Sequence, residues 1–305
     1  MEEVKKYILG ACLIPVILFV FLFYGPFEHF RTLWINTAMY TSNYKFLATS
    51  LFPEEYITKV INETALTTEE ITDRELINIR KRDDIQYTDI EGDNYKGFLM
   101  KVNDPNRVSL VTVEHSKGVL LEDITLAHNA VGGINASGYA DEQERGGEWG
   151  YCIADGNIIN ECHESEKHTI GGMDAGGTLV VGNFKDDEIQ VQDFRWAIEF
   201  GPILIVNGEK IEANKYSGGY APRTAIGQTK DGAMLLLVVN GRQISSVGAS
   251  FADLQTVLYA NGAINAIALD GGSSTTMVYD GEVVNSPSDG DSERLLPNAL
   301  IIDKK

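Results

Sequence analysis

One stretch of the sequence combines residue types that could do chemistry at a single place. Residues 263–279 read AINAIALDGGSSTTMVY, a pattern that predicts a buried strand over Ile264–Leu269, a polar loop and a second strand. Asp270 therefore follows directly after a hydrophobic strand. A carboxylate in this position could activate water, although a turn-capping Asp is the alternative interpretation.

The loop after Asp270 is rich in hydrogen-bond donors. Gly271 and Gly272 allow backbone N–H groups to approach a ligand closely. The hydroxyls of Ser273 and Ser274 add neutral donors, and two threonines follow. Such a loop suits an anionic or hydroxyl-rich substrate, whereas an ordinary turn would use the same hydroxyls on its own backbone.

Three other positions carry candidate functional side chains. Asn135 and Ser137 stand at the exit of a glycine-rich strand, VGGINASGY over residues 131–139. Arg223 stands in the segment PRTAIG, and a guanidinium can grip phosphate oxygens in a bidentate manner. A salt bridge on an acidic surface is the alternative for Arg223.

Taken in order, the motifs GGINASGY, GPILIVNG, PRTAIG, LDGGSSTTM and RLLPNALII resemble those of the phosphodiester glycosidase family. The resemblance covers residues 84–303. Members of this family remove a sugar from a sugar-1-phosphodiester and produce free sugar and a phosphomonoester. The same activity is what the resemblance implies for this chain.

The activity that the resemblance implies can be tested against the chemistry of the residues. A phosphate leaving group is a weak base, with a second pKa of about 6, so it needs charge stabilisation more than a strong general acid. Arg223 is the first candidate for that task and Arg294 the second. Asp270 would activate water or stabilise an oxocarbenium-like transition state, and Glu199 is a weaker second carboxylate. The sequence leaves open whether the reaction inverts or retains configuration.

The predicted substrate-binding residues surround these groups. Asn135 and Ser137 would bond to sugar hydroxyls or an N-acetyl group, and backbone N–H groups of the loop after Asp270 would cradle the phosphate. The full predicted set is Gly133, Asn135, Ser137, Gly271, Gly272, Ser273, Ser274 and Arg294.

Composition limits the class of partner. The chain has 305 residues, a formal net charge of −19 and 44% hydrophobic residues. This acidity argues against binding to nucleic acids, whose phosphates would be repelled. It does not exclude an anionic substrate, because a few arginines can dominate inside a cleft. The sequence does not identify a protein partner.

The N-terminal region predicts a membrane anchor. Tyr7–Tyr24 is uncharged and almost wholly apolar, long enough to span a bilayer as a helix with a tolerated kink at Pro15. Lys5 and Lys6 precede it, which places the N-terminus in the cytoplasm and the rest outside the membrane. A cleaved signal peptide is the alternative, but no small-residue cleavage pattern follows.

Beyond the anchor, strands outnumber helices. We therefore expect an α+β fold, a mixed, strand-rich sheet domain with a few helices. Ser250 and Asp253 form a capping-box pattern for a helix that leads into the strand before Asp270. The predicted organisation is an anchor over 1–26, a partly helical stalk over 27–83 and the glycosidase-like domain over 84–305.

No cofactor is predicted. The five histidines show no zinc-binding spacing, and the serine-rich loop lacks the lysine of a nucleotide-phosphate motif. Asp289 and Asp291 could contribute to a structural calcium site. Cys152 and Cys162 could form a disulfide or remain thiols.

The sequence thus predicts a membrane-anchored, extracytoplasmic hydrolase that cleaves the glycosidic C–O bond of sugar-1-phosphodiesters in cell-envelope or exopolysaccharide glycans. Two other functions stay open. One is a phosphodiesterase that cleaves the P–O bond, and the other is a non-catalytic surface protein that binds glycans or acts as a scaffold.

Overall fold

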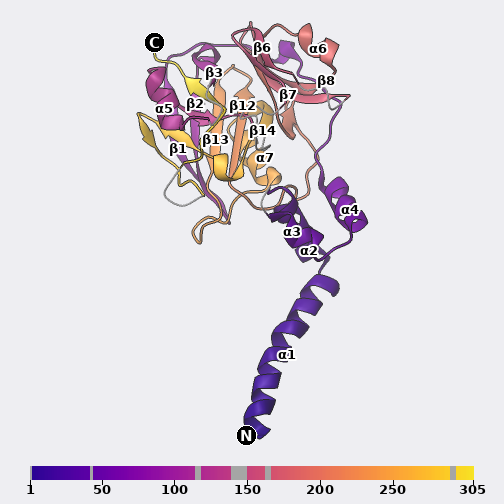
Figure 1. Ribbon diagram of the computed structural model, residues 1–305. Helices are drawn as coiled ribbons and strands as arrows, with labels where there is room; N and C mark the ends of the chain where they lie inside the picture. Colours follow the sequence, from indigo (N-terminus) through magenta and orange to yellow (C-terminus); the bar gives the residue numbers. More distant parts are fainter. Residues whose placement is uncertain (1, 42–43, 114–117, 139–149, 162–165, 289–292) are drawn as a thin grey trace. The chain divides into compact units, whose positions relative to one another are not determined.

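Antiparallel sheets form the larger part of the molecule (Figure 1). This computed structural model describes residues 2–41, 44–113, 118–138, 150–161, 166–288 and 293–305, with side chains from residue 13 onward. The described residues divide into two units, which are treated separately. One comprises residues 1–65 with 216–219, and the other comprises 66–215 with 220–305.

The larger unit contains a seven-stranded sheet that supports the predicted site. Its central strands β12, β13 and β14 lie side by side, and all its pairs are antiparallel (Figure 1). In spatial order the strands are β1 (Ile85–Glu91), β2 (Lys96–Val102), β13 (Met234–Val239), β12 (Arg223–Thr229), β14 (Ala263–Leu269), β10 (Ile203–Val206) and β11 (Glu209–Lys210).

Two five-stranded sheets complete the described strands of this unit. The second sheet has the order β16 (Glu282–Val283), β15 (Met277–Tyr279), β4 (Gly132–Asn135), β17 (Asn298–Ile302) and β3 (Val108–Thr112). The third sheet has the order β6 (Asn157–Asn160), β5 (Cys152–Ala154), β9 (Phe194–Glu199), β7 (His168–Asp174) and β8 (Leu179–Phe184).

Three short helices accompany these sheets: α5 (Leu121–Ala127), α6 (Asp186–Gln190) and α7 (Phe251–Ala260). The predicted capping box of α7 is confirmed, because Ser250 Oγ accepts from the Asp253 N–H and the Asp253 carboxylate accepts from the Ser250 N–H. Single 3₁₀ turns occupy Arg74–Leu76, Pro105–Arg107 and Gly272–Ser274. The predicted α+β, strand-rich fold is confirmed.

Burial on both faces explains the apolar strands of the seven-stranded sheet. One face packs against the other two sheets, where Ile226 and Ile267 join Trp196 and Leu300 in one core. The opposite face is covered by α7 through Phe251 and neighbouring apolar residues. Because both faces leave water, every residue of β13 is hydrophobic and buried. Burial of each such side chain stabilises the folded state by about 1.5–3 kcal/mol.

The larger unit begins at Leu66, upstream of the start expected at Asp84. Thr72 donates its N–H to the Val181 carbonyl on β8, at 3.0 Å. Arg74 lies 2.8 Å from the Asp174 carboxylate. Apart from one 3₁₀ turn, this leading segment has no helix or strand. Because hydrogen bonds and an ion pair attach this segment, the sequence shows no hydrophobic periodicity that would assign it to the domain.

The smaller unit is helical and has its own apolar core, built from Phe23, Ile35, Ala38, Ala48, Phe52, Ile57 and Val60. Residues 216–219 belong to it, and the Tyr216 ring lies 5.7 Å from that of His29. Its helices are α1 (Glu2–Tyr24), α2 (Glu28–Met39), α3 (Phe46–Thr49) and α4 (Glu54–Thr64).

The single transmembrane helix expected over Tyr7–Tyr24 is not supported. Where side chains are described, no one helix is sufficiently long and apolar to cross a bilayer. The helices over Leu13–Tyr24 and Glu28–Met39 meet that requirement only as a pair, and they are bent by 86° at their junction.

Candidate functional site

The site is built where strands from two sheets end beside each other. Asp270 follows β14 of the seven-stranded sheet, and Asn135 ends β4 of the second sheet. The Asp270 N–H donates to the Ala136 carbonyl at 3.0 Å. The Asn135 Nδ2 donates to the Asp270 carbonyl at 2.6 Å. Two strand ends far apart in the sequence are thereby held together.

Asn135 is a framework residue. Its side chain is fully buried, and its Oδ1 accepts from Thr224 Oγ1 at 2.7 Å and from the Thr276 N–H at 3.1 Å. The amide therefore bonds to protein groups on both its oxygen and its nitrogen. These bonds give Asn135 a positioning role inside the domain, and its predicted contact with the sugar stays a prediction.

Gly133 and Ser137 also lie inside the framework. A Cβ at Gly133 would lie 2.6 Å from the Leu300 carbonyl, so glycine lets β4 approach β17 closely. Ser137 is buried, accepts from Asn298 Nδ2 at 2.6 Å and donates its N–H to Asn298 Oδ1 at 2.8 Å. Both positions therefore support the packing of the strand ends, and their predicted substrate contacts stay predictions.

Arg223 lies at the neighbouring strand end. It begins β12 and is only 6% exposed. Its guanidinium carbon stands 4.3 Å above the Phe251 ring, a cation–π distance, and Nε donates to the Ala249 carbonyl at 3.3 Å. These contacts fix the orientation of the guanidinium. Because Thr224 pairs with Leu269, the segment of Arg223 lies beside the segment of Asp270.

The glycine-rich loop rests on the residue before Arg223. The Gly272 N–H donates to the Pro222 carbonyl at 2.9 Å, and Gly272 has a φ of +61°, which favours glycine. A Cβ at Gly271 would lie 2.8 Å from the same carbonyl. The N–H of Gly272 is therefore already used within the protein, which removes it from the predicted phosphate cradle. Ser274 is buried and donates its N–H to Gly271.

Arg242 is the functional candidate that sequence reasoning missed. It follows β13, and its Nη1 lies 3.4 Å from Ser273 Oγ and 3.3 Å from Ser288 Oγ. Its side chain is exposed, unlike that of Arg223. Residues 240–242, Asn-Gly-Arg, follow an apolar strand. An arginine directly after the end of an apolar strand is the signal in the sequence that could have identified it.

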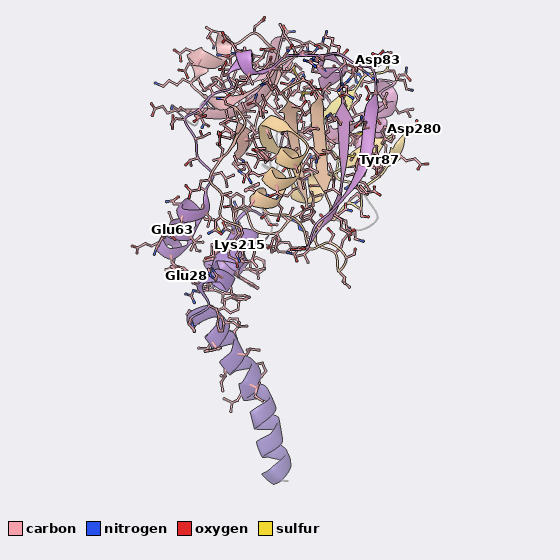
Figure 2. All side chains as sticks on the ribbon, turned by 180° about the vertical axis from the view of Figure 1, so that it is seen from behind. Glu28, Glu63, Asp83, Tyr87, Lys215 and Asp280 are labelled. Carbon is pink, nitrogen blue, oxygen red and sulfur yellow. The ribbon has the colours of Figure 1, made fainter. Side chains whose placement is uncertain are left out.

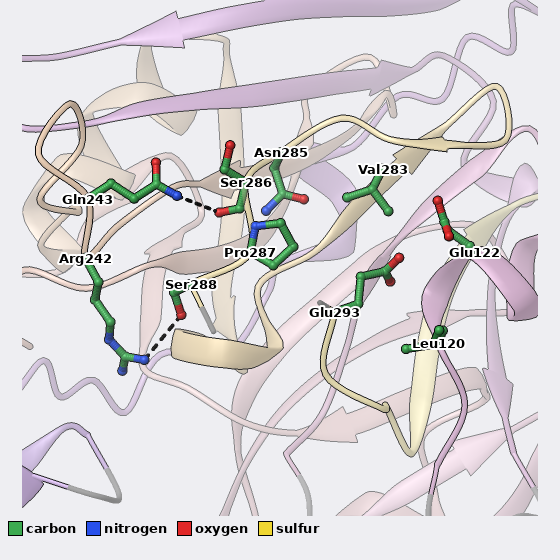
Figure 3. Close-up of a pocket in the computed structure, with 10 residues that line it drawn as sticks. All are labelled: Leu120, Glu122, Arg242, Gln243, Val283, Asn285, Ser286, Pro287, Ser288 and Glu293. Atoms are coloured by element: carbon green, nitrogen blue, oxygen red, sulfur yellow. Dashed lines mark hydrogen bonds between the residues drawn. The ribbon is translucent and has the colours of Figure 1, made fainter. Parts of the chain in front are cut away.

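A pocket opens beside Arg242, with a volume of about 930 Å³. Figure 3 shows Arg242 on one side of it and two glutamates, Glu122 and Glu293, on the other. The residues that line it are Leu120, Glu122, Arg242, Gln243, Val283, Asn285, Ser286, Pro287, Ser288 and Glu293.

Glu293 is electrostatically unusual. Burial raises the pKa of its carboxyl from 4.5 to about 7, and the nearby charge of Glu122 adds to the effect. A hydrogen bond from the Leu121 N–H, at 3.2 Å, acts in the opposite direction. Glu293 therefore changes charge near neutral pH, and it also accepts a bond at the start of α5.

Glu199 belongs to a separate buried group at the end of β9. It is 8% exposed, and its Oε2 accepts from the Tyr151 N–H at 2.9 Å. Its Oε1 lies 3.0 Å from His168 Nδ1, and His168 Nε2 lies 3.0 Å from Asp186 Oδ1. The turn after Glu199 does reach β14, where the Ala268 N–H donates to Pro202. The carboxylate itself is bound by the Tyr151 N–H and lies beside His168 of β7.

The remaining predicted positions are less informative. Arg294 lies half-buried in the segment that leads to β17. Asp289, Asp291 and Cys162 lie outside the described residues, and Cys152 is buried in β5. Among the residues that the structure describes, no group of three or more His, Cys, Asp or Glu side chains is placed to hold a metal ion.

Comparison with known proteins identifies the family. The family model for phosphodiester glycosidases matches residues 128–303, more than half of the chain. This protein belongs to the phosphodiester glycosidase family. The matched region contains Asn135, Arg223, Arg242 and Asp270, so the residues around the strand ends lie within the family domain.

Two individual proteins are similar to this chain in sequence. The mouse N-acetylglucosamine-1-phosphodiester alpha-N-acetylglucosaminidase is 27% identical over 222 residues, which cover 65% of this chain and 43% of the mouse protein. The uncharacterized SPbeta prophage-derived protein YomE of Bacillus subtilis is 31% identical over 179 residues, 55% of this chain and 27% of that protein. The chain thus spans less than half the length of these relatives.

Solved structures show the same fold. The zebrafish N-acetylglucosamine-1-phosphodiester alpha-N-acetylglucosaminidase catalytic domain, auto-inhibited by its pro-peptide, superposes with a TM-score of 0.60 at 25% identity and covers 73% of this chain and 83% of that chain. A putative exported protein of Burkholderia pseudomallei superposes with a TM-score of 0.55 at 16% identity, over 69% of this chain and 74% of that chain.

Replacing Asn135 tests its framework role. Asn135→Ala should lower the free energy of unfolding by about 3–5 kcal/mol, because it leaves buried backbone groups without partners and opens a small void. Chemical denaturation measures the change. Asn157→Ala, at an exposed residue of β6 whose side-chain Nδ2 donates to the Asp155 carbonyl, should cost no more than about 0.5 kcal/mol. Equal costs for the two variants would contradict the framework role.

Glu293 should impose a pH dependence on stability. Its folded-state pKa of about 7 exceeds the ordinary 4.5, so the folded protein holds a proton that the unfolded chain releases, and stability falls as pH rises from about 4.5 to 7. Partial exposure reduces the expected fall to about 1–2 kcal/mol. Glu293→Gln should remove this part of the urea-unfolding profile, whereas Glu209→Gln on the exposed β11 should not. An unchanged profile in Glu293→Gln would refute the assignment.

Proposed function

We propose that this protein hydrolyses the glycosidic C–O bond of sugar-1-phosphodiesters and releases free sugar and a phosphomonoester. The observation that carries the proposal is the family match across the segments that contain Asp270, Arg223 and Arg242. The named activity of the mouse relative, an N-acetylglucosaminidase acting on a 1-phosphodiester, supports the same reaction class.

The arginines suit a phosphate leaving group. As water attacks the anomeric carbon, the C–O bond breaks and its electron pair passes to the phosphate oxygen. Arg242, exposed beside Ser273, would contact the phosphate oxygens, and the more buried Arg223 would add positive charge behind the loop. Charge-assisted bonds from guanidinium groups are among the strongest available for phosphate. Departure therefore needs no strong general acid.

Asp270 suits the attacking side of the reaction. Its backbone is held by Ala136 and Asn135, so the direction in which its side chain leaves the strand is fixed. The carboxylate would accept a proton from the attacking water, or would stabilise positive charge that develops on the sugar ring. The proton then passes to solvent and the carboxylate is restored.

The decisive experiment is hydrolysis of N-acetylglucosamine-1-phosphodiesters in ¹⁸O-labelled water, followed by mass spectrometry. We expect the label in the free sugar, and Asp270→Asn should reduce turnover by about 10²–10⁴-fold. The matched control is Asp280→Asn in the exposed turn after β15, labelled in Figure 2. It should keep full activity. Label in the phosphate would establish a P–O phosphodiesterase instead, and binding without product would establish a glycan-binding protein.

We further propose that the chain is anchored in a membrane with its larger unit on the extracytoplasmic side, where cell-envelope or exopolysaccharide glycans supply such bonds. The uncharged run Tyr7–Tyr24 after Lys5 and Lys6 supports this location.

Fractionation of cells that express the protein tests the proposed location. The full chain should sediment with membranes and be released by detergent, and external protease should cleave the larger unit in intact spheroplasts. A chain that begins at Leu66 should be recovered without detergent. Recovery of the full chain in the soluble fraction would contradict the anchor.

A further inference from the structure

The pocket beside Arg242 is also lined by Glu122 and Glu293, which the proposed hydrolytic chemistry does not use. Arg242 contacts Ser273 on the loop after Asp270 and Ser288 on the pocket wall. A phosphate held by Arg242 at that loop would therefore sit at the pocket's edge. The sugar must face Asp270, so the substituent on the other side of the phosphate is the group that can enter the pocket.

The pocket is large enough for such a substituent. Its volume of about 930 Å³ exceeds what a phosphate group alone would fill, and lies within the range of small-molecule sites. Leu120, Val283 and Pro287 supply apolar surface that would suit a short alkyl chain.

The two amide side chains of the wall, Asn285 and Gln243, bond within the protein. Asn285 Nδ2 donates to the Thr275 carbonyl, and its Oδ1 accepts from the Met277 N–H. Gln243 Nε2 donates to the Ser286 carbonyl, a bond that Figure 3 shows as a dashed line. The charged side chains of the wall can in addition select a ligand by its charge.

The charged side chains on the two sides of the pocket have opposite signs. Arg242 stands on one side, and Glu122 and Glu293 stand on the other (Figure 3). The negative charges of Glu122 and Asp123 on α5 disfavour ionisation of Glu293. A cation placed between the two glutamates would relieve this repulsion, whereas an anionic substituent would increase it.

We infer that this pocket is a subsite for the substituent beyond the phosphate, and that it selects a substituent carrying an ammonium group, as in a phosphoethanolamine ester. The inference rests on the proposed function. In the corresponding reaction water attacks the sugar carbon, the C–O bond breaks, and the products are free sugar and phosphoethanolamine. Arg242 holds the phosphate of that product and the glutamates hold its ammonium.

Ligand titration followed by NMR tests the subsite without requiring turnover. The ligands are phosphoethanolamine, ethyl phosphate, which lacks the ammonium, and inorganic phosphate, all at pH 8. Phosphoethanolamine should bind about tenfold more tightly than ethyl phosphate, the factor expected for one favourable partly buried charge interaction. The double variant Glu122→Gln, Glu293→Gln should bring this ratio close to one. Glu209→Gln, on the exposed β11, should leave it unchanged.

The variant Arg242→Ala tests the phosphate-binding end of the pocket independently of the ammonium-binding end. It should weaken all three ligands by a similar factor and preserve the preference for the ammonium. The inference is overturned if wild-type protein binds phosphoethanolamine and ethyl phosphate equally, if neither binds, or if the preference survives in the double glutamine variant.

Turnover distinguishes failure of the subsite from failure of the proposed function. Hydrolysis of N-acetylglucosamine-1-phosphodiesters without any ammonium preference would leave the glycosidase function intact and refute the subsite. An ammonium preference that vanishes in the double variant, with no hydrolysis of any phosphodiester, would support the subsite and refute the hydrolytic function.

Discussion

The buried amide of Asn135 is the interaction on which the candidate site depends. It joins the carbonyl of Asp270, the hydroxyl of Thr224 and the N–H of Thr276, which belong to segments 89 to 141 residues away in the sequence. The bonds to Thr224 and Thr276 are buried, and the bond to Asp270 is part-buried, so an unmet partner is costly. They therefore hold the ends of β4, β12 and β14 in one arrangement, and that arrangement directs Asp270.

A second buried side-chain amide connects the seven-stranded sheet to the third sheet. Gln228 of β12 is fully buried. It accepts from the Leu179 N–H at 2.7 Å and donates to the Gly177 carbonyl at 2.7 Å. Apolar contacts between sheets tolerate small shifts, whereas buried hydrogen bonds require particular atoms to meet. Burial provides most of the stability of this domain, and the buried amides determine how its sheets are aligned.

The site divides its polar residues by depth. Asn135, Ser137 and Gly133 lie inside and support the strand ends, while Arg242 and Glu293 reach the surface of the pocket. Arg223 is intermediate, since its guanidinium is buried against an aromatic ring. In a chain with a net charge of −19, this division places the positive charge of Arg223 and Arg242 beside the loop that follows Asp270. Two arginines held at strand ends act locally, where the distant surface charges are screened.

The sequence by itself determined the local features of this protein. Alternation and apolar runs predicted the strand-rich fold, the capping box at Ser250 predicted α7, and the position of Asp270 after a buried strand was correct. The order of five motifs indicated the family, which the family match confirms. Each of these features depends on residues close together in the chain, so a local pattern is sufficient to reveal it.

Only the tertiary structure decided which polar side chains face the site. Asn135 points into the framework because its partners come from β12 and from the loop before β15. Arg242 reaches the glycine-rich loop, whose Ser273 lies 31 residues away. Residues 66–83 join the domain through hydrogen bonds to distant strands. Such contacts follow from how the sheets pack. They join residues far apart in the chain, so no local pattern of hydrophobic and polar residues predicts them.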